Sequence, residues 1–231
     1  MRAISDSALM PLPLSGPLSP IFPGKLCDLI LKDRAVTTYE KDQVIYDAPG
    51  RIRTIFFVRS GFVKVGAITE DGHELIYDVR TRGDVVGELC ASSHLRQDRA
   101  VALVESEIVA ARYEEVLDAA QQDRGLMLEF VQMFCDPLSE TYGQLSSVAF
   151  GDVLTRLVRV LRRLAAKIGR PAGAYTELPV HLTQETIGQM VAMRRERISW
   201  TMNLLRRRGV LDYSRRGYIV LDLAALSAYP S

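Results

Sequence analysis

The chain has 231 residues, enough for two compact domains or one large one, and 48% of them are hydrophobic against 25% charged. This composition excludes general disorder, a collagen-like repeat and a coiled-coil rod, and no apolar run reaches the roughly 18 residues of a transmembrane helix. The three scattered cysteines form neither a disulfide framework nor a zinc motif. We therefore expect a reducing, cytoplasmic setting and no bound metal.

The formal net charge of +1 conceals two halves of opposite sign. Residues 1–148 hold 15 Lys+Arg and 22 Asp+Glu, whereas residues 149–231 hold 14 Lys+Arg and 6 Asp+Glu. Such a division favours an acidic sensing half joined to a basic half that binds an anion, above all nucleic acid. An uneven solvated surface is the alternative that charge segregation alone leaves open.

Five of the ten prolines lie within the first 24 residues. They interrupt the apolar run that a secretory signal would need. We therefore predict a Pro-rich N-terminal arm over residues 1–21, ahead of a first domain over residues 22–124.

From about residue 39 to residue 112, short β-type runs alternate with turn signals. Asp71-Gly72, between two runs of alternating apolar residues, is a strong hairpin signal. No helix of βαβ length separates the runs, so they predict a sandwich or a rolled-up β-barrel rather than a doubly wound α/β fold.

A long helix is predicted over residues 125–148, because apolar residues there recur at spacings of three and four. A helix this long beside a small β-domain favours pairing with a second copy, although the stripe could also pack on its own domain. Pro137 and Gly143 lie inside the helix and should kink or loosen it. The predicted dimer contacts are Met127, Phe130, Phe134, Leu138 and Leu145.

The region over residues 149–231 shows the sharpest pattern. Asp152 is a plausible N-cap for one helix, and Thr183 caps a short helix over 184–191 in which Gly188 permits close helix contact. A turn at 192–193 leads to a second helix over about 195–208, which ends at Gly209. Two such helices form a helix-turn-helix, whose second helix fits the major groove of DNA, and residues 210–221 read as a β-hairpin wing.

Charged residues gather at the start of that second helix. Arginine can bond guanine O6 and N7 together and glutamate can accept from cytosine N4, so Arg195 and Glu196 can read a base step. The other arginines, including Arg215 and Arg216 in the wing, would bind phosphate. A solvated, salt-bridged helix face is the alternative. The predicted DNA contacts are Thr183, Gln184, Arg194, Arg195, Glu196, Arg197, Trp200, Arg215 and Arg216.

These residues resemble those of a known family. Residues 182–191 followed by 194–198 resemble the helix-turn-helix of Crp/Fnr-type bacterial transcription regulators. Residues 60–65, 82–89 and 99–101 resemble the family's cyclic-nucleotide-binding β-roll, and residues 148–153 resemble its interdomain hinge. The resemblance covers roughly residues 22 to 226, with three separate motifs in the right order.

The resemblance implies an α+β fold with an N-terminal β-roll (a double-stranded β-helix), a dimerisation helix and a C-terminal winged helix-turn-helix over 149–231. It further implies a homodimer, not an enzyme, that binds a pseudo-palindromic promoter site on double-stranded DNA and works with RNA polymerase. Arg195 and Glu196 would be the base readers, and Thr183 would touch phosphate. Arg197 and Trp200 depart from the family's usual residues, so the preferred half-site should differ as well.

The resemblance also implies an effector site, which this sequence matches only in part. Ala100 stands where the family's cyclic-nucleotide binders carry a hydroxyl, and the loop over 90–98 is one residue longer. Losing one hydrogen bond to a charged group costs roughly 1.5–3 kcal/mol. A cyclic nucleotide such as cyclic AMP (cAMP), another effector, or none at all are therefore the alternatives, the last with Glu88 and Arg99 as a structural ion pair. The candidate effector residues are Gly87, Glu88, Leu89, Arg99, Ala100 and Thr141.

Two alternatives to DNA binding are a metal enzyme and a regulatory subunit. A cupin-like metal oxygenase would need several close histidines, but the three histidines here are widely spaced. A cyclic-nucleotide-binding subunit that acts on a protein partner would leave the Arg-rich helix without a use. Iron–sulfur sensing needs about four cysteines, and this chain has three.

Overall fold

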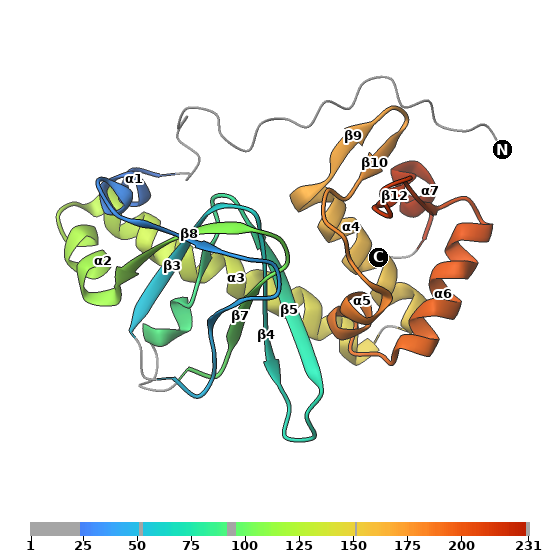
Figure 1. Cartoon of the computed structure of the whole chain (residues 1–231), viewed down its shortest axis with the longest axis horizontal. Helices are drawn as coiled ribbons and strands as arrows, with labels where there is room; N and C mark the ends of the chain where they lie inside the picture. Colours follow the sequence, from blue (N-terminus) through green and yellow to red (C-terminus); the bar gives the residue numbers. More distant parts are fainter. Residues whose placement is uncertain (1–23, 51–52, 92–95, 151, 230–231) are drawn as a thin grey trace.

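The computed structural model describes residues 24–50, 53–91, 96–150 and 152–229, and one long helix joins its β-rich half to its mainly helical half (Figure 1). The β-roll, the long helix and the winged helix-turn-helix confirm the predicted α+β fold class. The predicted N-terminal arm over 1–21 lies outside the described residues.

Two four-stranded antiparallel sheets form the β-roll, with strand orders β1-β8-β3-β6 and β2-β7-β4-β5. The hairpin predicted at Asp71-Gly72 joins β4 to β5, and Gly72 adopts the left-handed φ of +78° that the turn requires. The strands are β1 (Val36–Tyr39), β2 (Val44–Tyr46), β3 (Thr54–Ser60), β4 (Phe62–Ile68), β5 (Glu74–Thr81), β6 (Val85–Val86), β7 (Arg99–Ala102) and β8 (Ser106–Arg112).

Two apolar layers hold this half together. One lies between the sheets and includes Tyr46, Phe56 and Ile108. The other lies where α1 (Lys25–Leu31), α2 (Tyr113–Ala120) and the start of the long helix cover the outer face of β3 and β8. A short 3-10 helix, η1 (Glu88–Ala91), follows β6.

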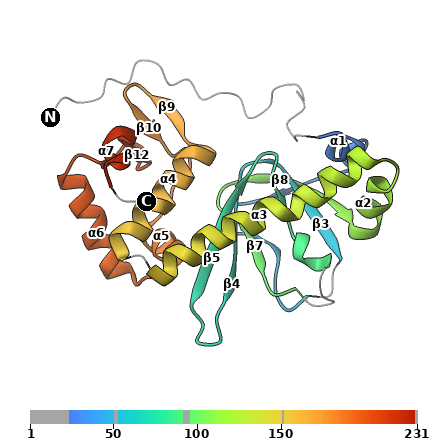
Figure 2. The same ribbon diagram turned by 180° about the vertical axis from the view of Figure 1, so that it is seen from behind.

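The long helix α3 (Arg124–Phe150) is continuous through Pro137, the residue expected to kink or loosen it. Thr141 Oγ1 donates to the Pro137 carbonyl at 2.8 Å, one turn later in the helix. Proline removes one backbone donor, and the packing of the first turns of α3 on the β-roll can offset that loss. Figure 2 shows α3 running across the face of the molecule from α2 toward α4.

The C-terminal half places four helices around a small antiparallel sheet of order β11-β12-β10-β9. The hairpin of β9 and β10 was not predicted, because each strand has only three residues and the first contains Pro171. The elements are α4 (Val153–Ile168), β9 (Arg170–Ala172), β10 (Tyr175–Glu177), α5 (Gln184–Met190), α6 (Arg195–Arg207), β11 (Leu211–Tyr213), β12 (Ile219–Leu221) and α7 (Leu223–Ser227).

The two halves share one apolar cluster. Ile76, Val79 and Leu103 of the β-roll pack in the same buried group as Leu157 and Leu161 of α4. The helix α5 lies against β5, as Figure 1 also shows. The C-terminal half is therefore docked on the edge strand of one sheet. Among the described helices, none combines the length and apolar character needed to cross a bilayer.

Candidate DNA interface and effector pocket

The helix-turn-helix is closed by local interactions that the sequence predicted. Thr183 Oγ1 accepts a hydrogen bond from the Thr186 amide at 3.0 Å and caps α5. A Cβ on Gly188 would lie 2.7 Å from the Met193 carbonyl oxygen, so only glycine lets the turn pass this close. Ala192 takes a left-handed φ of +54° in that turn, where a residue with a Cβ is strained. These features fix α6 relative to α5.

The second helix, α6, has one buried face and one solvent face. Ile198, Met202 and Leu205 are buried against the rest of the helical half. On the opposite face Trp200 is 69% exposed, one turn beyond the exposed Glu196. A surface hollow of about 400 Å³ opens at the start of α6, lined by Ala192, Met193, Arg194, Glu196 and Arg197.

The arginines of this half fall into two groups. Arg206 pairs with Asp212 at 2.8 Å and so ties α6 to β11, and Arg162 donates to two carbonyls near the C-terminus. By contrast, Arg194, Arg195 and Arg197 are exposed and form no ion pair with any residue in the described part of the chain. The second group is thus available for an external anion.

The wing is present where the sequence placed it. Strands β11 and β12 pair antiparallel, and the Ser214 amide donates to the Tyr218 carbonyl at 2.8 Å across the turn. Arg215 and Arg216 are exposed at its tip. The solvent face of α6, the hollow and the wing therefore supply one basic surface of the kind that binds a nucleic-acid backbone.

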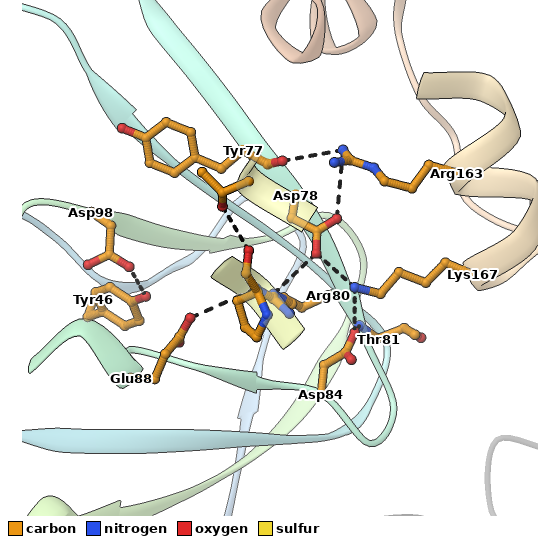
Figure 3. A network of polar contacts seen from close by, with 12 residues as sticks. Tyr46, Tyr77, Asp78, Arg80, Thr81, Asp84, Glu88, Asp98, Arg163 and Lys167 are labelled. Carbon is orange, nitrogen blue, oxygen red and sulfur yellow. Dashed lines mark hydrogen bonds and ion pairs between the residues drawn. The ribbon is translucent and has the colours of Figure 1, made fainter. Parts of the chain in front are cut away.

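Two of the candidate effector residues, Glu88 and Arg99, have different charged neighbours. Glu88 is 8% exposed, and its Oε1 lies 3.9 Å from Arg80 Nη2 (Figure 3). Burial raises the pKa of Glu88 above its ordinary value, and Arg80 only partly offsets that effect. Arg99 instead approaches Asp47 at 3.6 Å. The suggested Glu88–Arg99 ion pair is therefore replaced by separate partners among the described residues.

Sequence reasoning missed Arg96 and Asp98, which the long loop folds into the roll. Arg96 Nη1 donates to the Gly87 carbonyl at 3.1 Å, and its guanidinium lies 4.2 Å from the ring centroid of Tyr46. The Tyr46 hydroxyl donates to Asp98 at 2.6 Å. Burial, and to a lesser degree the charge of Asp98, raises the pKa of Tyr46 well above its ordinary value. Buried positions are usually predicted from the alternation of polar and apolar residues. A loop has no such alternation, so the sequence did not indicate that Arg96 and Asp98 are buried.

The other effector candidates differ in burial. Ala100 is fully buried in β7, where its small side chain fits between the sheets. Leu89 is 48% exposed, and Thr141 lies on the exposed surface of α3. Within the described residues, no group of three or more His, Cys, Asp or Glu side chains is placed to hold a metal ion.

The predicted dimer residues split between two sides of α3. Phe130 is buried and Met127 and Phe134 pack beside it against the β-roll, so these three contact their own chain. The side chain of Leu145 is outside the described part, and Leu138 is exposed. A neighbouring stripe at spacings of three, seven and four also faces solvent: Leu128 is 56% exposed, Val131 47%, Leu138 50% and Tyr142 61%.

Comparisons with known proteins address both halves. Residues 36–123 match the model of the cyclic nucleotide-binding domain, and residues 155–229 match that of the Crp-like helix-turn-helix domain. The chain is 27% identical over 188 residues to the cAMP-activated global transcriptional regulator Vfr of Pseudomonas aeruginosa, which covers 78% of this chain and 86% of that protein.

Two further similarities extend over most of the chain. The global nitrogen regulator of Synechocystis is 24% identical over 195 residues, covering 83% of this chain and 87% of that protein. The solved structure of FixK2 from Bradyrhizobium japonicum superposes with a TM-score of 0.75 at 19% identity, over 86% of this chain and 98% of that one. This last similarity concerns the fold.

Replacing Glu88 with Gln should raise the free energy of unfolding at neutral pH. Because the pKa of Glu88 is raised in the folded state, its ionised carboxylate destabilises that state above the ordinary pKa of 4.5. Below that pH the carboxyl is protonated in both states, so the advantage of the variant should vanish. Urea unfolding at pH 4 and pH 7 measures the difference, with the exposed Glu70→Gln as control. A variant less stable than wild type at pH 7 would contradict this expectation.

Proposed function

The chain belongs to the Crp/Fnr family of bacterial transcription regulators, and from that premise we propose that it acts as a homodimer on a two-fold symmetric DNA site. The observation that supports this most strongly is the solvent face of α6, where Arg195, Glu196 and Trp200 are exposed beside arginines that form no ion pair with the described residues. RNA polymerase is the further protein partner that such a regulator requires.

Arg195 and Glu196 are the base readers in this proposal. They begin α6, and Glu196 lines the hollow at its N-terminus, so both can reach base edges when the helix enters the major groove. Thr183, Gln184, Arg194, Arg197 and the wing residues Arg215 and Arg216 contact phosphates and set the register.

The dimer forms through the exposed stripe of α3, which keeps the predicted contact Leu138 but not Met127, Phe130 and Phe134, since these pack on their own chain. Leu128, Val131, Leu138 and Tyr142 are each about half exposed, and they repeat with the heptad spacing of a two-stranded coiled coil. A stripe of this kind on a soluble protein is a contact surface. The helix α3 is apolar on two sides. Because the side that carries Phe130 packs on the β-roll, the other side is left for the partner.

For the effector we propose only its class, a small molecule. Several relatives, Vfr among them, are described as cAMP-activated. In this chain, Arg99 is directed to Asp47 and Ala100 supplies no hydroxyl, so a cyclic phosphate would have fewer partners than in the family pattern. We propose that any small effector binds near Glu88, and calorimetric titration with cAMP measures whether it is this one.

Substituting both Arg195 and Glu196 with Ala should remove base preference. The probe is a duplex selected from a random pool by the wild-type protein, compared with a scrambled duplex of equal composition. The ratio of the two affinities should fall at least about tenfold, since one good bidentate contact discriminates by roughly 1–3 kcal/mol. Arg216→Ala is the matched control: both duplexes should weaken alike, and the salt slope should drop by about one. Equal losses in the double variant would refute the assignment of base readers.

Trp200 should contact a thymine methyl group. Its indole is exposed on the DNA-facing side of α6, where apolar contacts read the C5-methyl of thymine. Replacing single thymines of the selected site with deoxyuridine removes only that methyl. At one position the wild type should bind about fourfold more weakly, as expected for roughly 0.8 kcal/mol per buried carbon group. Trp200→Ala should be insensitive there, and equal sensitivity of both proteins at every position would exclude the contact.

Val131→Glu should convert the dimer to a monomer. The new charge would lie in the apolar seam, whereas Gln132→Glu places the same charge on a neighbouring exposed position outside it. Sedimentation equilibrium measures the mass of each protein. The control should remain dimeric, and a Val131→Glu protein that also remains dimeric would show that another face forms the interface.

A further inference from the structure

A chain of alternating charges crosses the junction between the two halves (Figure 3). At its centre is Asp78 of β5, a carboxylate that is 4% exposed. Lys167 of α4 donates to Asp78 Oδ2 at 2.7 Å, and Arg163 lies 3.8 Å from Oδ1. Lys167 also lies 3.2 Å from Asp84. One buried acid of the β-roll thus receives two cations from the DNA-binding half.

The local sequence explains why the two cations converge. Arg163 and Lys167 are four residues apart, so they project from the same side of α4. Both are largely covered, at 20% and 17% side-chain exposure, and Arg163 also donates to the Tyr77 carbonyl at 3.3 Å. Helix α4 therefore contacts both a backbone carbonyl and a side chain of β5.

The same carboxylate is connected through Arg80 to Glu88, a candidate effector residue. Arg80 lies two residues along β5, on the same face of the strand as Asp78. Its Nε is 3.3 Å from Asp78 Oδ2, while its Nη2 is 3.9 Å from Glu88. One buried guanidinium is therefore shared between Asp78, at the domain junction, and Glu88, inside the β-roll.

Apolar packing and ion pairing contribute differently at this junction. The contact of Ile76, Val79 and Leu103 with α4 is non-directional, so it favours docking without fixing one orientation. The bonds to Asp78 have defined geometry and can select one orientation. Burial alone would raise the pKa of Asp78, but Lys167, Arg80 and Arg163 outweigh burial, and the pKa lies below its ordinary value. Asp78 is thus ionised at neutral pH, and removing its partners would leave a buried charge.

We propose that Asp78 is a positioning residue that fixes the DNA-binding half on the β-roll with its recognition helix outward, and that Arg80 links this contact to Glu88. The inference rests on the proposed function, because it concerns how a dimer places two recognition helices. Through this link, a change in the charge or contacts of Glu88 alters the hold on α4.

The test compares full-length Asp78→Asn and Lys167→Met proteins on two duplexes, the selected inverted repeat and a single half-site. Both variants should bind the inverted repeat at least about tenfold more weakly, since a buried ion pair is broken. Binding to the half-site should stay within about twofold, because it does not depend on how the two recognition helices are spaced. Equal losses on both duplexes would indicate a general folding defect and overturn the positioning role, as would wild-type affinity for the inverted repeat.

Asp71→Asn is the matched control, an exposed acid in the turn that leads into β5. It should bind both duplexes as the wild type does. Lys167→Met examines the same contact from the other half, so the test survives if Asp78→Asn folds poorly. In the double variant the two losses should not multiply, because both substitutions remove one interaction.

The link through Arg80 is tested by combining Asp78→Asn with Glu88→Gln. If one guanidinium serves both acids, the loss of affinity of the double variant for the inverted repeat should differ by at least about threefold from the product of the losses in the two single variants. Effects that simply multiply would overturn the link and leave only the positioning role.

A readout without DNA separates this inference from the proposed function. Hydrogen exchange of the amides in β5 and α4 should be faster in Asp78→Asn than in wild type, because docking is loosened. Failure of the wild type to select any sequence would overturn the proposed function, whereas unchanged exchange in Asp78→Asn would overturn this inference.

Discussion

The arrangement of the molecule depends on the docking of α4 and α5 against β5, the edge strand of one sheet. This contact joins a buried apolar cluster to the ion pairs of Asp78 with Lys167 and Arg163. All other features of the C-terminal half, including the wing and the exposed face of α6, take their position from it. The β-roll and the helix-turn-helix half are thus joined by contacts between side chains, in addition to the covalent connection through α3.

The β-roll and its junction with α4 bury five charged side chains. Asp78, Arg80, Glu88, Arg96 and Asp98 are each at least nine-tenths buried. Ionised groups in such a place destabilise the fold unless they are paired, and here the pairing is incomplete: burial raises the pKa of Glu88, and one oxygen of Asp98 accepts no hydrogen bond from the described residues. Groups kept at such a disadvantage are typical of functional sites.

Local patterns in the sequence predicted the parts of the fold that depend on neighbours in the chain. The Thr183 cap, the tight passage at Gly188 and the wing each follow from a few adjacent residues, as does the Asp71-Gly72 hairpin. The Asp78–Lys167 contact joins residues 89 positions apart, and no periodicity announces it. Arg96 entered the roll from a loop without a pattern. Three residues of the predicted dimer stripe, Met127, Phe130 and Phe134, pack on their own domain. The spacing of apolar residues cannot say which of two apolar sides of a helix faces its own domain.

The unbroken length of α3 has a mechanical consequence. The helix begins among the residues that cover the β-roll and ends immediately before α4, and its 27 residues span about 40 Å at 1.5 Å per residue. A rod of that length works as a lever: tilting one end by about one degree displaces the other by about 0.7 Å. A small tilt of α3 where it leaves the β-roll is thereby amplified at the end of the helix that adjoins α4.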